Sequence, residues 1–383
     1  MNDLTRRHLL RTLIAGSVLA TSPKLFAQTL SQSDSPIHDP LQGWFSPQGA
    51  KADTFGFGAE LNLSQGPVLT TGLSGFRGHG GAEHPTKPDT VLMFARRPGR
   101  ESIEVNLRSG AITQRFQTPE NRHFFGHGAF SADGKTLFTT EADLDRNVGV
   151  IGIRDAHTYR WLGEFESGGV GPHELKRVDD RHLVIANGGI LTRPEQGRKK
   201  LNLATMAPNL TYLNYHTGEI VEQIQPPESK ASIRHLDVAA DGTVAFGMQL
   251  QRQACHHDRL FPLTALHTLG QSPRFLSQPD FVVRQLHDYV GSVTLSDQSR
   301  LVGFTSPKGD LAAFWHLDSG DFAGHHAMKD VCGLALNGAK DGFVLTNSFG
   351  AVHEVDAHTL QERVDRRQHL PKVAWDNHML TIG

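Results

Sequence analysis

The sequence predicts an all-β protein, a seven-bladed β-propeller whose last blade is closed by N-terminal strands. Two observations lead to this prediction. Short apolar segments separated by polar turns recur through the chain at a spacing of about 40 to 60 residues, which is typical of propeller blades. Helical periodicity, in contrast, is hardly visible anywhere in the sequence.

The repeat is clearest in four segments, each of which has a first strand, a polar turn and a second strand. These segments are residues 126–141, 172–187, 234–249 and 290–305. Hairpins such as 148–165 and 210–224 follow them and supply the third and fourth strands of a blade. A further copy covers about residues 331–348.

The two ends of the chain are expected to share the last blade. Residues 368–383 resemble a truncated repeat that supplies two inner strands, and segments 54–61 and 66–73 supply the outer ones. Closing the ring in this way removes exposed sheet edges. Counting inner strands gives seven blades, with six or eight as alternatives because the first unit aligns poorly.

The first 27 residues predict a twin-arginine signal peptide. Arg6 and Arg7 precede two leucines, another base and an apolar stretch at 13–20, which is shorter than the roughly 20 residues that span a bilayer. We expect cleavage after Ala27, a flexible linker over 28–40 and the propeller over 41–383. The predicted location is the periplasm, with no integral membrane segment after signal removal; the alternative is an amphipathic N-terminal helix of the mature fold.

Composition argues against several classes of function. With 38 basic and 40 acidic residues and no basic stripe, a nucleic-acid partner is not expected. There is no phosphate loop, Gly-x-Ser-x-Gly or His-Glu-x-x-His motif, so nucleotide cofactors and hydrolase chemistry have no support. Cys255 and Cys332 can pair in an oxidising compartment, and the lack of Cys-x-x-Cys-His excludes covalent haem. The 22 histidines stand out.

Histidines recur at the start of the first strand of the repeats. Three of them, His127, His173 and His235, are in strict register. Extending that register to the last blade gives a fourth, His369. A fifth, His79, lies in the first blade in a segment that resembles the Gly-His-Gly pattern around His127. We expect these five to line one mouth of the channel. Blades five and six carry Gly291 and Cys332 instead, so the face is asymmetric.

Imidazole is the commonest transition-metal ligand, and carboxylates or amides in the surroundings steady it. Glu174 directly follows His173 and is a further candidate metal ligand. Candidate cofactor-binding residues near the same rim are Arg77, Glu141, Asn187, Arg234 and Gln249. The predicted cofactor is iron, another transition metal such as copper or zinc, or non-covalent haem.

Other interpretations stay open. The histidines can be framework residues as in WD40 propellers, but that reading predicts a His in every blade and a recurring Trp-Asp, which occurs once, at Trp375-Asp376. Residues 255–258 (Cys-His-His-Asp) look ligand-like, whereas His325-His326 is interpreted as an outer hairpin turn. The basic run 193–200 is interpreted as a mobile loop over the mouth that can attract an anionic ligand.

The Arg-Gly-His, Gly-His-Gly, Gly-Pro-His-Glu and Arg-His-Leu segments resemble the ordered motifs of an uncharacterised exported bacterial family, domain of unknown function fifteen-thirteen. The matching residues are Arg77, His79, His127, His173, Glu174, Arg234 and His235. The resemblance implies twin-arginine export, a propeller, and periplasmic iron acquisition beside imelysin-like and di-haem oxidoreductase-like proteins. No activity or catalytic residue comes with it, so a metal- or haem-binding protein, a partner-docking scaffold and a metal-dependent lactonase or oxidoreductase remain the alternatives.

Overall fold

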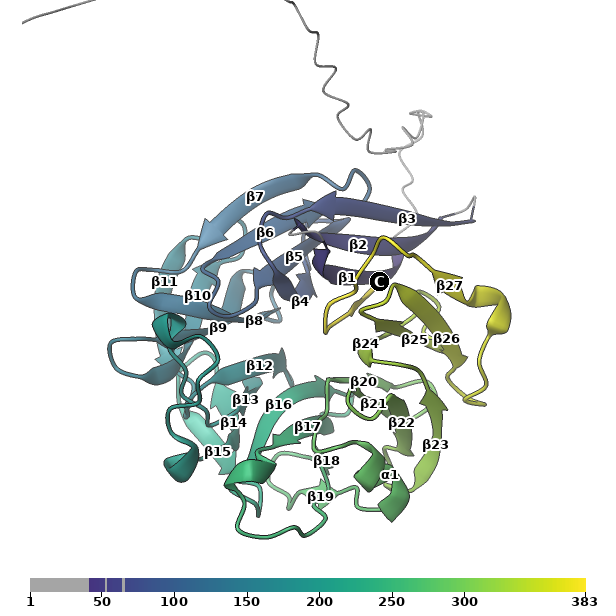
Figure 1. Cartoon of the computed structure of the whole chain (residues 1–383). Helices are drawn as coiled ribbons and strands as arrows, with labels where there is room; N and C mark the ends of the chain where they lie inside the picture. The colour runs from purple at the N-terminus through teal and green to yellow at the C-terminus, as the bar shows by residue number, and fades with distance from the viewer. Residues whose placement is uncertain (1–40, 52–53, 64–65) are drawn as a thin grey trace, which may run out of the picture. The chain divides into compact units, whose positions relative to one another are not determined.

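The computed structural model describes residues 41–51, 54–63 and 66–383, and these form seven four-stranded antiparallel sheets arranged in a ring (Figure 1). The predicted all-β class and the count of seven blades are therefore confirmed. The predicted signal peptide and linker lie outside the described residues. In the part of the chain that the structure describes, no helix is long and apolar enough to cross a membrane.

In blades 1 to 6 the first strand along the chain is the innermost, and these strands line the central channel (Figure 1). Blade 1 contains β4 (Gly78–Glu83), β5 (Thr90–Ala95), β6 (Glu101–Asn106) and β7 (Ile112–Gln117). Blade 2 contains β8 (Arg122–Phe130), β9 (Thr136–Asp143), β10 (Val148–Asp155) and β11 (Trp161–Glu166). Blade 3 contains β12 (Pro172–Arg177), β13 (His182–Asn187), β14 (Asn209–Asn214) and β15 (Ile220–Ile224).

The remaining blades follow the same order around the ring. Blade 4 contains β16 (Ala231–Val238), β17 (Val244–Leu250), β18 (Thr264–His267) and β19 (Arg274–Phe275). Blade 5 contains β20 (Ser292–Ser296), β21 (Leu301–Ser306), β22 (Leu311–His316) and β23 (Phe322–Ala327), and the short helix α1 (Asp280–Gln285) precedes it. Blade 6 contains β24 (Val331–Leu336), β25 (Gly342–Asn347), β26 (Ala351–Asp356) and β27 (Gln368–His369).

The seventh blade joins both ends of the chain, as predicted, but with a different division of strands. Its innermost strand is β28 (Leu380–Ile382), and β1 (Gln42–Lys51), β2 (Thr54–Leu63) and β3 (Gly66–Leu73) follow outward. The C-terminal segment thus supplies one strand rather than two. The other expected inner strand, β27, is the outer strand of blade 6, where His369 pairs with Ala351.

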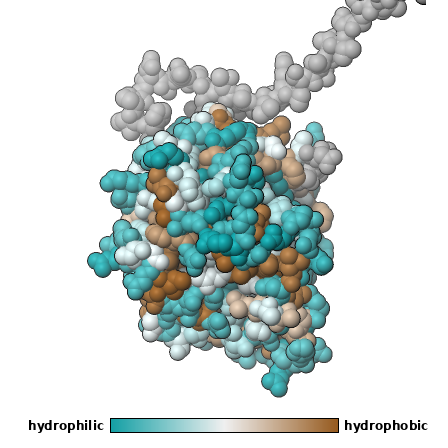
Figure 2. All heavy atoms as spheres, turned by 90° about the vertical axis from the view of Figure 1, so that its left-hand side faces the viewer, coloured by the Kyte–Doolittle hydropathy of each residue, from teal (hydrophilic) through white to brown (hydrophobic). Residues whose placement is uncertain are grey.

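Burial follows from the position of each strand in its blade. Inner and middle strands such as β5, β21, β24 and β25 are buried at every residue, because neighbouring blades cover both faces of the sheet. An outer strand such as β7 instead alternates between partly buried and exposed residues. Accordingly, the side of the ring shown in Figure 2 is largely hydrophilic with scattered apolar patches.

Bulges interrupt the innermost strands near the places where the repeated histidines lie. The pairing with the second strand shifts between Gly78 and Gly81 in β4, between Phe124 and Gly128 in β8, and between Pro172 and Glu174 in β12. A bulge leaves residues out of the ladder and redirects their side chains. His79, His127 and His173 all lie inside these irregular stretches. The same strand can therefore pair within its sheet and direct a histidine side chain into the channel.

Candidate metal centre

Five buried imidazoles converge in the channel. Their ring centroids lie 4.4 Å apart for His79 and His378 and for His235 and His378, and 4.6 Å apart for His173 and His235. His127 lies 5.0 Å from His79 and from His378. The exposed fraction of each of the five residues is between 2% and 8%. Side chains from four inner strands and from the C-terminal segment therefore form one compact cluster.

The structure brings together four of the five histidines that the sequence singles out, namely His79, His127, His173 and His235. The placement of His369 is wrong. It is exposed on the outer strand β27, because the Arg-Gln-His-Leu segment that echoes Arg-His-Leu pairs with β26 rather than opening an inner strand. His378, which sequence reasoning missed, takes its place just before β28.

The closing blade holds the segment that carries His378. The backbone N–H of Asp376 donates to the carbonyl of Pro47, and Ser46 Oγ donates to the carbonyl of His378 at 3.2 Å. Trp375 packs edge-on against Trp44 of β1, with the ring centroids 5.3 Å apart. These contacts fix the backbone on both sides of His378, so the closed propeller determines the direction in which its imidazole points.

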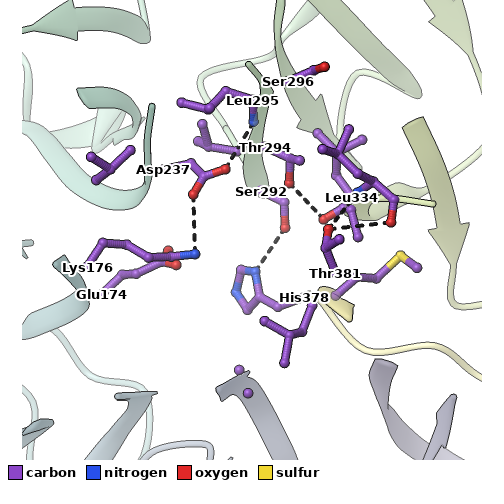
Figure 3. A pocket seen from close by; sticks show the side chains of 18 of the residues that line it. Glu174, Lys176, Asp237, Ser292, Thr294, Leu295, Ser296, Leu334, His378 and Thr381 are labelled. Carbon is purple, nitrogen blue, oxygen red and sulfur yellow. Dashed lines mark hydrogen bonds and ion pairs between the residues drawn. The ribbon is translucent and has the colours of Figure 1, made fainter. Parts of the chain in front are cut away.

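A serine from blade 5 orients the imidazole of His378 (Figure 3). Ser292 Oγ donates to the carbonyl of Asn377 at 2.8 Å and lies 2.9 Å from His378 Nδ1. Since the hydroxyl proton goes to that carbonyl, we assign Nδ1–H of His378 as the donor to Ser292. This tautomer leaves Nε2 with a lone pair directed away from the serine.

Glu174 supports two further histidines. Its Oε2 lies 3.3 Å from Nδ1 of His235, and its Oε1 lies 3.5 Å from Nδ1 of His127. A carboxylate that accepts from Nδ1–H of both rings leaves both Nε2 atoms free, the arrangement that orients metal-bound histidines in proteins. Burial raises the pKa of Glu174, and the neighbouring His127 opposes this effect.

Four ring nitrogens of the cluster are buried and have no hydrogen-bond partner among the described residues. They are Nδ1 of His79, Nε2 of His127, Nδ1 of His173 and Nε2 of His378. Burial lowers the pKa of His127 and of His235 to about 3. Burial also holds the pKa of His79, His173 and His378 well below its usual range. At neutral pH the imidazoles are thus uncharged, which is the form that binds metals.

Two sets of three nitrogens come close enough together to hold a metal ion. One set belongs to His79, His127 and His173, and the other to His127, His235 and His378, with the ligand atoms of each set within 4.8 Å of one another. The two sets share His127. We therefore treat them as one centre with five available imidazoles.

The glycines next to these histidines provide the space in which the rings pack. A Cβ added at Gly80 would lie 2.6 Å from Nδ1 of His127, and one added at Gly126 would lie 2.5 Å from Cδ2 of His79. Gly126 also has φ +112°, a conformation that side chains rarely adopt. The Gly-His-Gly pattern therefore reflects the close approach of β4 and β8.

A cavity of about 370 Å³ adjoins the centre on the side where the inner strands end, and His127, Glu174 and His378 are among its lining residues (Figure 3). An ion pair between Lys176 Nζ and Asp237 Oδ1, 3.3 Å long, crosses its wall. The attraction of Asp237 raises the pKa of Lys176. The cavity therefore borders two of the imidazoles, those of His127 and His378.

Three of the predicted cofactor-binding residues serve their own blades or the next one instead. Glu141 is buried in an ion pair with Arg154, 2.9 Å from Oε1 to the guanidinium. Asn187 donates from Nδ2 to the carbonyl of Ser167 and to Asn209 Oδ1 inside blade 3. Gln249 donates to the carbonyl of Val290 at 3.1 Å. These amides and the carboxylate stabilise the framework around the channel.

The two predicted arginines lie at the mouth where the inner strands begin. Arg77 forms two hydrogen bonds with the carboxylate of Asp376, from Nε at 2.5 Å and from the terminal NH2 at 3.0 Å. Arg234 is buried beside His235. Burial, followed by the charges of Arg97 and Arg96, lowers the pKa of Arg234 to about 9.

The remaining sequence candidates are not members of the five-histidine cluster. His257 forms an ion-pair contact of 3.0 Å with Glu228, and Cys255 and Cys332 are both free thiols. His325 and His326 lie on strand β23 rather than in a turn. His326 Nε2 lies 3.0 Å from Nδ1 of His353, and with Glu362 the two form a partly buried group that can also hold an ion.

Comparisons with known proteins agree with the fold and leave the chemistry open. The model of the family described as "Protein of unknown function (DUF1513)" matches residues 74–382, and the chain belongs to this family. The search of curated proteins finds no match. Among solved structures, hydrazine synthase from Kuenenia stuttgartiensis is similar, with 12% identity, a TM-score of 0.59, and coverage of 85% of this chain and 98% of that chain. At this identity the likeness shows the fold alone.

Proposed function

We propose that this member of the DUF1513 family binds a transition-metal ion, with iron favoured, in the five-histidine centre and serves iron acquisition in the periplasm. The observation that carries the proposal is the convergence of five buried imidazoles, four of which direct an unpaired nitrogen into the protein interior. An unpaired buried polar atom costs free energy, and bound metal would remove that cost. Framework histidines of the WD40 kind would have their nitrogens hydrogen-bonded.

A bare ion fits the centre better than haem does. In every ring pair of the cluster except His79 and His235, the centroids lie between 4.4 and 6.4 Å apart, and rings from several directions surround each gap. Neighbouring imidazoles therefore occupy the plane that a porphyrin would need between two axial ligands. A single ion needs only the ligand spacing that the two sets of three nitrogens already provide.

The choice of iron rests on the setting rather than on the ligands. Neutral imidazoles suit iron, copper, zinc and nickel, so the donor set alone does not select one of them. The twin-arginine signal predicted over residues 1–27 and the resemblance to an iron-associated exported family favour periplasmic iron. Imelysin-like and di-haem oxidoreductase-like proteins are the partners that we propose on the same ground.

Elemental analysis of the protein purified from its native host tests metal binding. We expect about one equivalent of transition metal per chain in the wild type. The same content is expected in His369→Ala, which removes an exposed histidine outside the centre. In His127→Ala and His173→Gln the content should fall by roughly tenfold or more. A wild-type protein without bound metal that also takes up none of iron, copper or zinc on titration would overturn the proposal.

The proposed periplasmic location and role in iron acquisition are tested separately. Cell fractionation should find the chain in the periplasm, and replacing Arg6 and Arg7 by lysines should retain it in the cytoplasm. A strain that carries only His127→Ala should grow more slowly than one that carries His369→Ala when iron is withheld, and equally well when iron is supplied. Equal growth under iron limitation would contradict the role in iron acquisition without contradicting metal binding.

A further inference from the structure

A group of arginines at the channel mouth has more positive charge than the described acidic residues around it can neutralise. Arg77, Arg96, Arg97 and Arg198 line one cavity of about 540 Å³. In that wall Arg77 is paired with Asp376, whose side chain is fully buried, and Arg193, which also lines the cavity, lies 3.9 Å from the exposed carboxylate of Glu195. Arg96, Arg97 and Arg198 have no carboxylate partner among the described residues. Arg97 is held by a hydrogen bond of 2.6 Å to Thr192 Oγ1, which positions the guanidinium without neutralising it.

Arg234 adds a buried cation beside this wall. The residue is 7% exposed, its Nε is buried without a partner, and no described residue forms a hydrogen bond or ion pair with its guanidinium. A buried charge is normally paired, because transferring it from water is costly. The charges of Arg97 and Arg96 act on Arg234 and repel it. Because no described residue pairs with its guanidinium, the arrangement is unfavourable until an anion joins it.

The cavity is not purely polar. Phe55, Phe76, Ala95 and Pro98 contribute apolar surface next to the arginines. A guanidinium presents a planar fork of donors that matches a carboxylate in two parallel hydrogen bonds. Several such forks over a partly apolar wall suit an organic anion with more than one carboxylate better than a bare inorganic ion.

We propose that the arginine cavity binds a small organic polycarboxylate, held by Arg96, Arg97, Arg198 and Arg234. Arg77 of the cavity wall is two residues from His79 along the chain, and Arg234 directly precedes His235, so this anion site lies next to the imidazole centre. The site itself does not depend on the proposed metal. If both sites function, a polycarboxylate that carries a metal ion as a chelate would bind next to the imidazole centre.

Isothermal titration of the metal-stripped full chain with tricarballylate, which binds metals weakly, tests the anion site. We expect binding that weakens as salt is added, because charge–charge contacts are screened. Arg96→Gln and Arg234→Gln should each weaken it by tenfold or more. The matched control Arg100→Gln removes an exposed arginine from the same blade, whose hydrogen bonds go to Thr118 and Pro119, and should leave the affinity unchanged.

Three results would overturn the proposal. One is the absence of binding at millimolar tricarballylate. Another is a wild-type affinity in both Arg96→Gln and Arg198→Gln, which change the cavity wall. These two variants keep the test valid if Arg234→Gln does not fold. The third is equal affinity for inorganic phosphate, which would contradict the organic class. Repeating the titration with His127→Ala separates the two proposals, since that variant should lose metal and keep the anion.

Discussion

Ser292 and His378 are hydrogen-bonded across the channel, 2.9 Å from Oγ to Nδ1, although one belongs to blade 5 and the other precedes the innermost strand of blade 7. Blade 5 carries no histidine at the start of its inner strand, yet it supplies the group that orients the histidine of another blade. The centre is thus built from more blades than those that contribute imidazoles.

Replacing Ser292 by alanine should weaken metal binding without unfolding the protein. The imidazole of His378 would lose the acceptor that fixes its tautomer, and loss of such a supporting contact typically costs 10- to 100-fold in affinity. Thr294→Val removes another buried hydroxyl of β20, one that donates to Leu334 and not to a histidine, and is the control. A competition titration with a chromogenic chelator measures both variants, and equal affinities would refute the role of Ser292.

Glu174→Gln should also lower metal affinity by about 10- to 100-fold. The carboxylate lies 3.3 Å from Nδ1 of His235 and 3.5 Å from Nδ1 of His127. An amide offers one acceptor and one donor group instead, so one of the two rings must change its tautomer or its position. Asp237→Asn, in the wall of the same cavity but paired with Lys176, is the matched control. If both variants bind metal as the wild type does, Glu174 is not a supporting residue.

Gly126→Ala should destabilise the fold by about 1 to 3 kcal/mol, because it combines a positive φ with a contact against His79. Gly197 has φ +60° and open space around its Cα, so Gly197→Ala measures the backbone cost alone. The difference between the two melting temperatures isolates the steric part. Equal melting temperatures would show that β4 and β8 do not approach as closely as described.

The stability of the ring at low pH should depend on Asp143. Burial alone would raise its pKa, but hydrogen bonds from the backbone and side chain of Arg146, with the charge of Arg122, lower it to about 2. A lowered pKa stabilises the fold above the unfolded-state pKa of roughly 3.9, and this stabilisation is lost as the pH falls through about 2.

The corresponding variant is Asp143→Asn. It should cost about 1 to 2 kcal/mol of unfolding free energy at pH 6 and almost nothing at pH 2, as measured by urea denaturation across that range. Asp365→Asn changes an exposed acid and should show no such trend. A cost for Asp143→Asn that stays constant from pH 6 to pH 2 would contradict the pKa assignment.

The propeller could be predicted from the sequence because each blade repeats a local pattern of strand, turn and strand. The histidines of blades 1 to 4 could be predicted because three of them recur in register with the strand-turn-strand pattern, and His79 lies in a similar Gly-His-Gly segment. The bulges do not affect this prediction of the strands, because they change the pairing between strands but not the order of residues along each strand.

His378 and Ser292 could not be found in that way. β28 has three residues and shows no periodicity of its own, so the segment around His378 carries no repeat signal, while Arg367-Gln-His-Leu offers a false one. Which of the two histidines reaches the channel depends on the pairing of β28 with β1, a contact between opposite ends of the chain. That Arg234 is buried without a described partner likewise could not be predicted from the sequence, because it depends on which residues the fold places around it.

The joined seventh blade also has a consequence for the timing of metal capture. The segment of His378 is held in place by the pairing of β28 with β1, so a chain in which these two strands have not yet paired does not hold this imidazole in the channel. Such a chain can offer four imidazoles and an open ring, but not the finished centre. If the centre binds metal as proposed, the compartment in which the ring closes decides which ion first meets all five imidazoles, whichever compartment the protein later occupies.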